Sequence, residues 1–179
     1  RDEIVANAVL LLTAGIDTTA GLIGNAIHLL LDRPDVAERI AREPGFATRV
    51  VEETLRFEAP AISCSRSAFE DVEIEGRNIS GDANVLLGLA AANRDPNRFP
   101  DPETFDPDRD LGEVLSFGGG RHHCLGAPLA RLEARLTLEA LFANGAPRFE
   151  RIEAPVWQRR NPTVRALERL PAEPAGVST

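Results

Sequence analysis

The segment Phe117–Gly126, FGGGRHHCLG, limits the possible folds of this chain more than any other feature. It places one cysteine, Cys124, in a glycine-rich loop directly before a long amphipathic stretch that is typical of a helix. The partial positive charge and the free N–H groups of a helix N-terminus favour a thiolate over a thiol. Glycines leave no side chains that would keep a flat, bulky group away from the backbone. Cys124 is therefore a candidate ligand or nucleophile.

The residues alone leave four interpretations of Cys124 open. It is a structural cysteine in a tight loop, or it belongs to a loop that cradles phosphate. The phosphate loop is disfavoured because Gly118–Gly120 lacks the lysine of a P-loop and follows no clear strand. A zinc site built from His122, His123 and Cys124 is strained, because only one further His and one further Cys exist. In the fourth interpretation, the lone thiolate is the axial ligand of a haem.

Composition limits the class of protein. The chain has 179 residues, of which 43% are hydrophobic, enough for one ordinary domain or a large part of a bigger one. A formal net charge of −8 argues against nucleic-acid binding, which depends on basic residues that neutralise phosphates. Two cysteines imply no disulfide framework. No signal-peptide pattern is visible at the N-terminus, so we expect a cytoplasmic protein.

Residues 4–31 are almost continuously apolar and predict a helix about 40 Å long that ends before Pro34. The length also suits a membrane span. Asp17 in the middle disfavours one, because a carboxylate inside a membrane is costly. We therefore expect the buried central helix of a soluble protein.

The centre of this helix, Ala14–Thr19, contains residues that weaken a helix. One interpretation is close helix packing against Gly15, with threonine hydroxyls bonded to carbonyls of their own helix. The other is a bulge that opens a groove for a small ligand. Asp17 and Thr18 would then offer a carboxyl and a hydroxyl for proton transfer.

Glu53 and Arg56 are three residues apart in a segment, residues 45–57, that predicts a helix, so they share a face and can pair. An exposed pair would contribute only about 0–1 kcal/mol. A buried pair would be costly to break, because the loss of one partner strands the other charge.

The other segments predict smaller elements. Helices are predicted at 34–42 and at 127–144, the second with Gly145 as its stop signal. Residues 61–88 predict β hairpins, and 149–152 and 163–167 predict weak strands. Residues 95–107, which are rich in Pro, Asp and Phe, predict an ordered irregular segment.

Taken in order, these features resemble the cytochrome P450 family, the haem-thiolate monooxygenases. The segments that carry the resemblance reach from residue 1 to about residue 171. The Glu53–Arg56 pair is similar to the family's Glu-x-x-Arg pair, and Ala14–Thr19 to its oxygen-activating stretch. Residues 92–109 are similar to the irregular meander before the cysteine. The cysteine loop matches the haem-binding motif at Phe117, Gly118, Gly120, His122, Cys124 and Gly126.

The resemblance implies a mainly α fold with small β-sheets, the C-terminal haem-binding half of the P450 fold. This half comprises the long central helix, the Glu-x-x-Arg helix, β hairpins, the meander, the Cys loop and the following helix. Family members are more than twice as long, and this chain starts at Arg1 and contains no methionine. We therefore expect residues 1–171 to be one haem-binding portion of a larger domain, with a mobile tail at 172–179. The missing N-terminal half of the same enzyme is then an expected partner.

The resemblance also implies roles for single residues. Cys124 would bind the iron of haem b (iron protoporphyrin IX), and Phe117 would pack beside the sulfur. His122 and Arg66 would hold the haem propionates. Asp17 and Thr18 would serve oxygen activation and proton delivery. The remaining members of the implied cofactor-binding set are Gly15, Gly118, Gly120 and Gly126.

The implied enzyme inserts one atom of O₂ into a small organic substrate, with electrons from a ferredoxin-type donor. The alternative is a non-catalytic truncated homologue or interaction module that retains the haem-proximal architecture. The joint presence of Cys124, Asp17 and Thr18 favours the enzyme, because a pseudo-enzyme has little reason to keep all three. We expect neither a nucleic acid nor a membrane as a partner.

Overall fold

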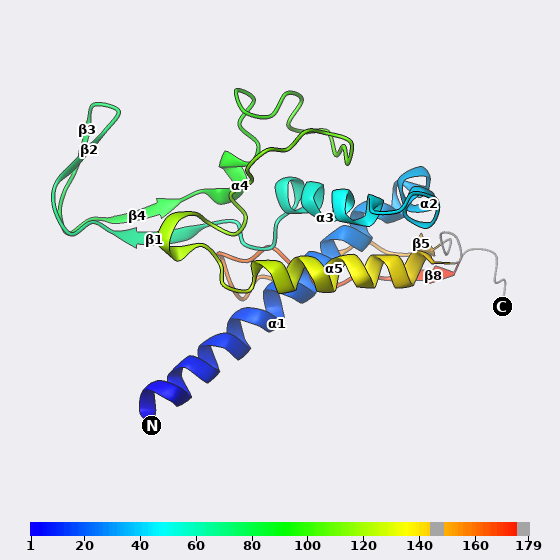
Figure 1. Ribbon diagram of the computed structural model, residues 1–179, viewed down its shortest axis with the longest axis horizontal. Coiled ribbons are helices and arrows are strands. Elements are labelled where there is room, and N and C mark those ends of the chain that lie inside the picture. Colours follow the sequence, from blue (N-terminus) through cyan, green and yellow to red (C-terminus); the bar gives the residue numbers. More distant parts are fainter. Residues whose placement is uncertain (144–148, 175–179) are drawn as a thin grey trace.

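The computed structural model describes residues 1–143 and 149–174, and it is mainly helical with small sheets (Figure 1). The helices are α1 (Asp2–Leu31), α2 (Pro34–Arg42), α3 (Phe46–Phe57), α4 (Leu89–Ala92) and α5 (Ala127–Phe142), with a short 3-10 helix, η1 (Gly120–His122). The strands are β1 (Cys64–Ser67), β2 (Val72–Ile74), β3 (Arg77–Ile79), β4 (Asn84–Leu87), β5 (Phe149–Arg151), β6 (Val156–Trp157), β7 (Leu167–Arg169) and β8 (Ala172–Pro174). The predicted fold class is thereby confirmed.

The core lies where the second half of α1 meets α2, α3 and α5 (Figure 1). Apolar residues repeat at helical spacing on each of these faces. The fully buried members include Leu22, Ala26, Val50, Val51, Leu55, Ala134 and Leu138. This packing fixes α3 and α5, the two helices that flank the cysteine loop in space.

The first half of α1 is exposed, so the expected burial of the central helix is correct only for its second half. This half projects away from the other helices (Figure 1), and nothing in the described part of the chain covers it. Its large apolar side chains are 56–74% exposed at Ile4, Val5, Val9, Leu10, Leu11, Leu12 and Ile16. By length and composition α1 is able to cross a membrane, a test that core helices of soluble proteins also pass.

The strands form antiparallel pairs: β1 with β4, β2 with β3, β5 with β8 and β6 with β7. The hairpins predicted at 61–88 are present as β2–β3, enclosed by the wider β1–β4 ribbon. The strand predicted at 163–167 is displaced to β7, and Val164 forms only an isolated bridge to Ala61. The strand is displaced because its position is set by its partner, and the residues that pair with β6 are those of β7.

Two predicted features, the end of the last long helix and the C-terminal tail, extend into residues that the structure does not describe. The last long helix ends at Phe142, while its predicted stop, Gly145, lies outside the described residues. Residues Ala172–Pro174 of the predicted tail form β8, and residues 175–179 lie outside the described part.

Candidate functional site

A cavity of about 360 Å³ lies between α1, β1 and the cysteine loop. Its lining includes Thr18 from α1, Arg66 from β1, and Phe117, His122 and Cys124 from the loop. Far apart in sequence, these five predicted site residues meet at one cavity because the core holds α1 against the loop. These five residues bring one thiol, one hydroxyl, two basic groups and an aromatic ring to the cavity, and a second thiol, that of Cys64, also lines it.

Backbone hydrogen bonds give the cysteine loop a defined shape. The Cys124 N–H donates to the Phe117 carbonyl at 2.9 Å, and the Gly118 N–H donates to the Leu115 carbonyl at 2.8 Å. Gly118 and Gly120 have φ values of +69° and +63°, which side chains other than glycine rarely adopt. The loop therefore presents Cys124 as a free, exposed thiol just before α5.

The residues present fit a haem. A Cβ added to Gly119 or Gly120 would meet no atom within 4 Å, so the loop leaves open space beside its backbone. In the described part of the chain, the Arg66 side chain bonds only to the Ser65 carbonyl, at 2.8 Å, which leaves guanidinium donors for a carboxylate. An exposed loop cysteine with basic groups around the same cavity matches what haem requires of a protein.

Glu53 and Arg56 form a fully buried ion pair, with both side chains 0% exposed. The Arg56 guanidinium donates to the two Glu53 carboxylate oxygens at 2.8 and 2.7 Å. It also donates to the carbonyls of Pro102 and Thr104 at 2.8 and 2.9 Å. Glu53 Oε1 accepts the Asp106 N–H at 2.8 Å. The pair thus ties α3 to the irregular segment that leads toward the loop.

A second polar network, which the sequence analysis did not identify, reaches the loop itself. Buried Asn93 donates through Nδ2 to Ser116 Oγ at 2.7 Å and accepts the Leu115 N–H at 2.8 Å. The Ser116 hydroxyl in turn donates to the Leu55 carbonyl. These bonds fix the residue that precedes Phe117. No pattern along the sequence indicates this network, because Asn93 acts through contacts with residues more than twenty positions away.

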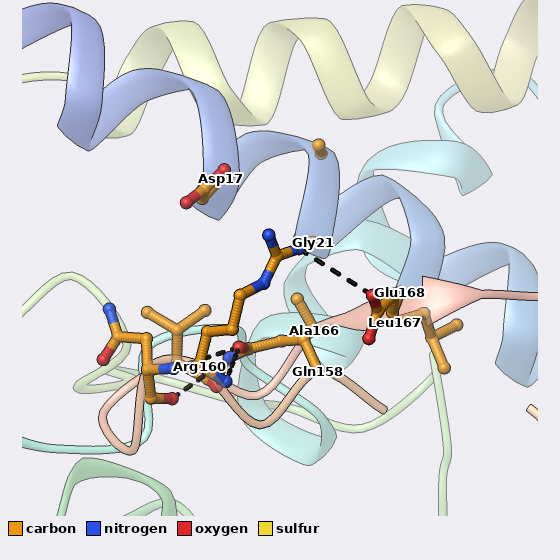
Figure 2. A pocket seen from close by; sticks show the side chains of 10 residues that line it. Asp17, Gly21, Gln158, Arg160, Ala166, Leu167 and Glu168 are labelled. Carbon is orange, nitrogen blue, oxygen red and sulfur yellow. Dashed lines mark hydrogen bonds and ion pairs between the residues drawn. The ribbon is translucent and has the colours of Figure 1, made fainter. Parts of the chain in front are cut away.

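Asp17 and Thr18 face different cavities. The Thr18 hydroxyl, on the cysteine side, donates to the Ala14 carbonyl at 2.7 Å. Asp17 lines a second cavity of about 310 Å³ with Gln158 and Arg160 (Figure 2). Neighbouring residues of an α-helix point about 100° apart, so one helix serves both sides. The proposed bulge is not observed, because α1 is α-helical from end to end.

Three predicted cofactor residues lie outside the lining of the cysteine cavity. Gly15 is exposed, and a Cβ there would meet nothing within 4 Å, so nothing in the described part of the chain packs closely against it. The other part of that interpretation, a threonine hydroxyl bonded to its own helix, is present at Thr18. Gly120 begins η1, and Gly126 precedes α5, where an added Cβ would lie 3.9 Å from Cys124 Sγ.

The zinc interpretation finds no support in the geometry. Across residues 1–143 and 149–174, no cluster of three or more His, Cys, Asp or Glu side chains is arranged to hold a metal ion.

Comparison with known proteins decides the family. A sequence model of cytochrome P450 matches residues 45–145, more than half of the chain. This chain belongs to the cytochrome P450 family. The 6-deoxyerythronolide B hydroxylase of Saccharopolyspora erythraea is 43% identical over 172 residues, covering 95% of this chain and 42% of that P450. The vitamin D(3) 25-hydroxylase of Pseudonocardia autotrophica is 42% identical over 173 residues, covering 96% and 43%.

Solved P450 structures match the fold closely. CYP164A2 from Mycobacterium smegmatis, with econazole bound, is 43% identical with a TM-score of 0.88, over 96% of this chain and 42% of that one. CYP109E1 from Bacillus megaterium, in complex with testosterone, is 34% identical with a TM-score of 0.90, over 97% and 48%. The chain thus spans less than half the length of these P450 relatives.

Proposed function

We propose that this chain is the haem-binding part of a monooxygenase that inserts one atom of O₂ into a small organic substrate. One observation carries the proposal: a single free loop cysteine, Cys124, lines the same cavity as Thr18 of the long helix. Membership in the P450 family and the hydroxylase names of two relatives support this reaction class.

Cys124 would hold haem by its thiolate. Haem bound there supplies the iron at which O₂ is activated, and a thiolate ligand favours cleavage of the O–O bond. Arg66 and His122, which line the cavity, would bind the propionates by charge-assisted hydrogen bonds. Phe117 would cover the ligand side, since its ring lines the cavity and its carbonyl accepts the Cys124 N–H.

Thr18 and Asp17 would divide proton delivery between the two faces of α1. The Asp17 side chain is exposed and lines the second cavity, so it would take up protons from solvent. The Thr18 hydroxyl is half-buried on the cysteine side, and it would pass a proton to the reaction space by giving up its hydrogen bond to the Ala14 carbonyl. Electrons would come from a ferredoxin-type donor, in the cytoplasm, and the intact enzyme would include a further N-terminal half.

The test is the absorption spectrum of the reduced, haem-loaded protein under CO. We expect the Soret band that is diagnostic of thiolate ligation in the parent, and its loss in Cys124→Ala with helical circular dichroism retained. Cys64→Ala is the matched control, because Cys64 lines the same cavity on β1. Equal bands in the parent and in Cys124→Ala, or a parent spectrum typical of histidine ligation, would refute the assignment. A ligated protein without turnover would favour the non-catalytic alternative.

A further inference from the structure

Arg131 on α5 joins a surface carboxylate to the aromatic ring of the cysteine loop. Its Nε donates to Glu52 Oε1 at 2.6 Å and its Nη2 to Glu52 Oε2 at 3.2 Å, a two-point ion pair between α5 and α3. The guanidinium carbon lies 4.5 Å from the centroid of the Phe117 ring. Both charged side chains are about one-third exposed or less, at 34% and 27%. Neither the spacing of these residues nor the proposed reaction accounts for this arrangement.

Phe117 carries the contact to the proposed ligand. Its ring accepts the cation–π interaction from Arg131, and its carbonyl accepts the Cys124 N–H at 2.9 Å. Both loop residues line the same cavity. Arg131 therefore acts on Cys124 through one intervening residue, in the way that outer partners orient a metal ligand.

The charge of Arg131 is balanced by a side chain and not by the helix dipole. Arg131 lies four residues after the first residue of α5, beyond the first turn in which the dipole acts. Glu52 compensates the charge from the neighbouring helix. Charges interact more strongly in a partly buried site than in water. The balance between the Arg131 and Glu52 charges therefore affects the energy of any further charge gained near the cysteine loop.

We propose that Arg131 and Glu52 form a charge-balanced positioning pair for the Cys124 ligand. Arg131 holds Phe117 against the loop, and Glu52 cancels the field that Arg131 alone would exert on the metal centre. This inference rests on the proposed function, because it requires haem to be bound by Cys124. Its consequence is that the two residues tune the reduction potential in opposite directions.

The experiment measures the reduction midpoint potential of the haem-loaded enzyme by spectroelectrochemical titration. Arg131→Gln leaves the Glu52 carboxylate uncompensated, which disfavours the electron gained on reduction, so the potential falls. Glu52→Gln leaves the cation uncompensated, so the potential rises. The double variant returns toward the parent value. Arg135→Gln is the control, since Arg135 pairs with Glu139 one turn further along α5 at 2.9 Å.

Shifts of the same sign in the two single variants, or no shift beyond that of the control, would overturn the inference. A simple loosening of the loop would move the potential in the same direction whichever charge is removed. A parent that lacks the thiolate band under CO overturns the proposed function, and this inference with it. A parent with the band but without opposite shifts overturns the inference alone.

Arg131→Lys separates position from charge. Lysine keeps the positive charge but lacks the planar fork that engages Glu52 and the ring together. We expect a potential near that of the parent, with a larger fraction of the CO complex lacking the thiolate band. An unchanged fraction would contradict the positioning role.

Discussion

Arg56 shows how one buried charge organises a segment without regular structure. All five N–H donors of its guanidinium have acceptors: two oxygens of Glu53 and the carbonyls of Asn93, Pro102 and Thr104. The carbonyls belong to a stretch with little helix or strand. Their hydrogen-bond donors therefore come from this side chain and not from the backbone N–H groups of a helix or sheet. The conformation of the irregular segment therefore depends on one arginine in α3.

The first prediction concerns this pair. Arg56→Ala strands the buried Glu53 carboxylate, and the expected loss of stability is about 3–5 kcal/mol. Urea unfolding of the haem-loaded protein measures the change. Arg135→Ala is the control, because its pair with Glu139 is partly exposed and contributes about 0–1 kcal/mol. Losses of similar size in the two variants would contradict the role of burial.

The second prediction concerns Thr18. Thr18→Ala removes the hydroxyl on the cysteine side of α1, so reducing equivalents should pass to peroxide instead of product in the haem-loaded enzyme. Thr13→Ala is a matched control, because Thr13 also bonds back to its own helix, at 2.5 Å, but lies in the exposed half. The yield of product per electron consumed is the measurement. Equal coupling in the parent and in Thr18→Ala would reject the proton-delivery role.

The sequence identified residues that line the cysteine cavity, but it did not identify the residues that hold the loop in place. Cys124 and Thr18 stand in local motifs that can be recognised along the chain, and Arg66 followed from the family resemblance. Asn93 and Arg131 were not identified, because each acts through contacts with residues more than twenty positions away. Such contacts are set by tertiary packing, which a linear pattern does not record.

The junction of α1 with the small C-terminal sheets depends on His28. Its Nδ1 lies 3.1 Å from the Arg151 guanidinium of β5, which also pairs with Asp32 at 2.9 Å. Its ring packs edge-on against Trp157 of β6, with centroids 5.6 Å apart. Burial, and secondarily the charge of Arg151, lowers the pKa of His28 below its ordinary value. The folded junction therefore favours the neutral imidazole.

The third prediction follows from the sign of that shift. Because the pKa of His28 is lower in the folded than in the unfolded protein, its contribution to stability is fully present above the ordinary value of about 6.5. The contribution is lost as the pH falls below that value. Denaturant unfolding at about pH 7.5 and about pH 5.5 should show a larger loss for the parent than for His28→Gln. Equal losses would show that His28 is not linked to this junction.

The strands show where pattern-based prediction ends. The β2–β3 hairpin lies within the predicted region 61–88, and Glu75 and Gly76 in its turn adopt positive φ values of 50° and 75°. The pairing of β1 with β4 and the displacement of β7 depend on which strand lies opposite. A short strand has little periodicity of its own, so its partner decides its ends.

The molecule as described has two unlike halves of α1. The second half is enclosed by the core, whereas the first half exposes apolar residues on all sides. The sequence correctly predicted a long apolar helix, but hydrophobicity alone does not reveal whether the chain supplies a covering surface. The exposed half is consistent with the observation that the chain spans less than half the length of its relatives.

The last prediction is that these 179 residues alone self-associate. An exposed apolar surface of this extent is an association hazard in water, and a second copy of the same helix offers a matching face. Val9→Lys combined with Leu12→Lys should shift sedimentation equilibrium toward the monomer, because both positions lie in the exposed half at 58% and 65% exposure. Ile152→Lys is the control, since Ile152 is 54% exposed but directly follows β5. A monomeric parent at all concentrations, or an equal shift in the control, would show that the exposed half of α1 does not drive association.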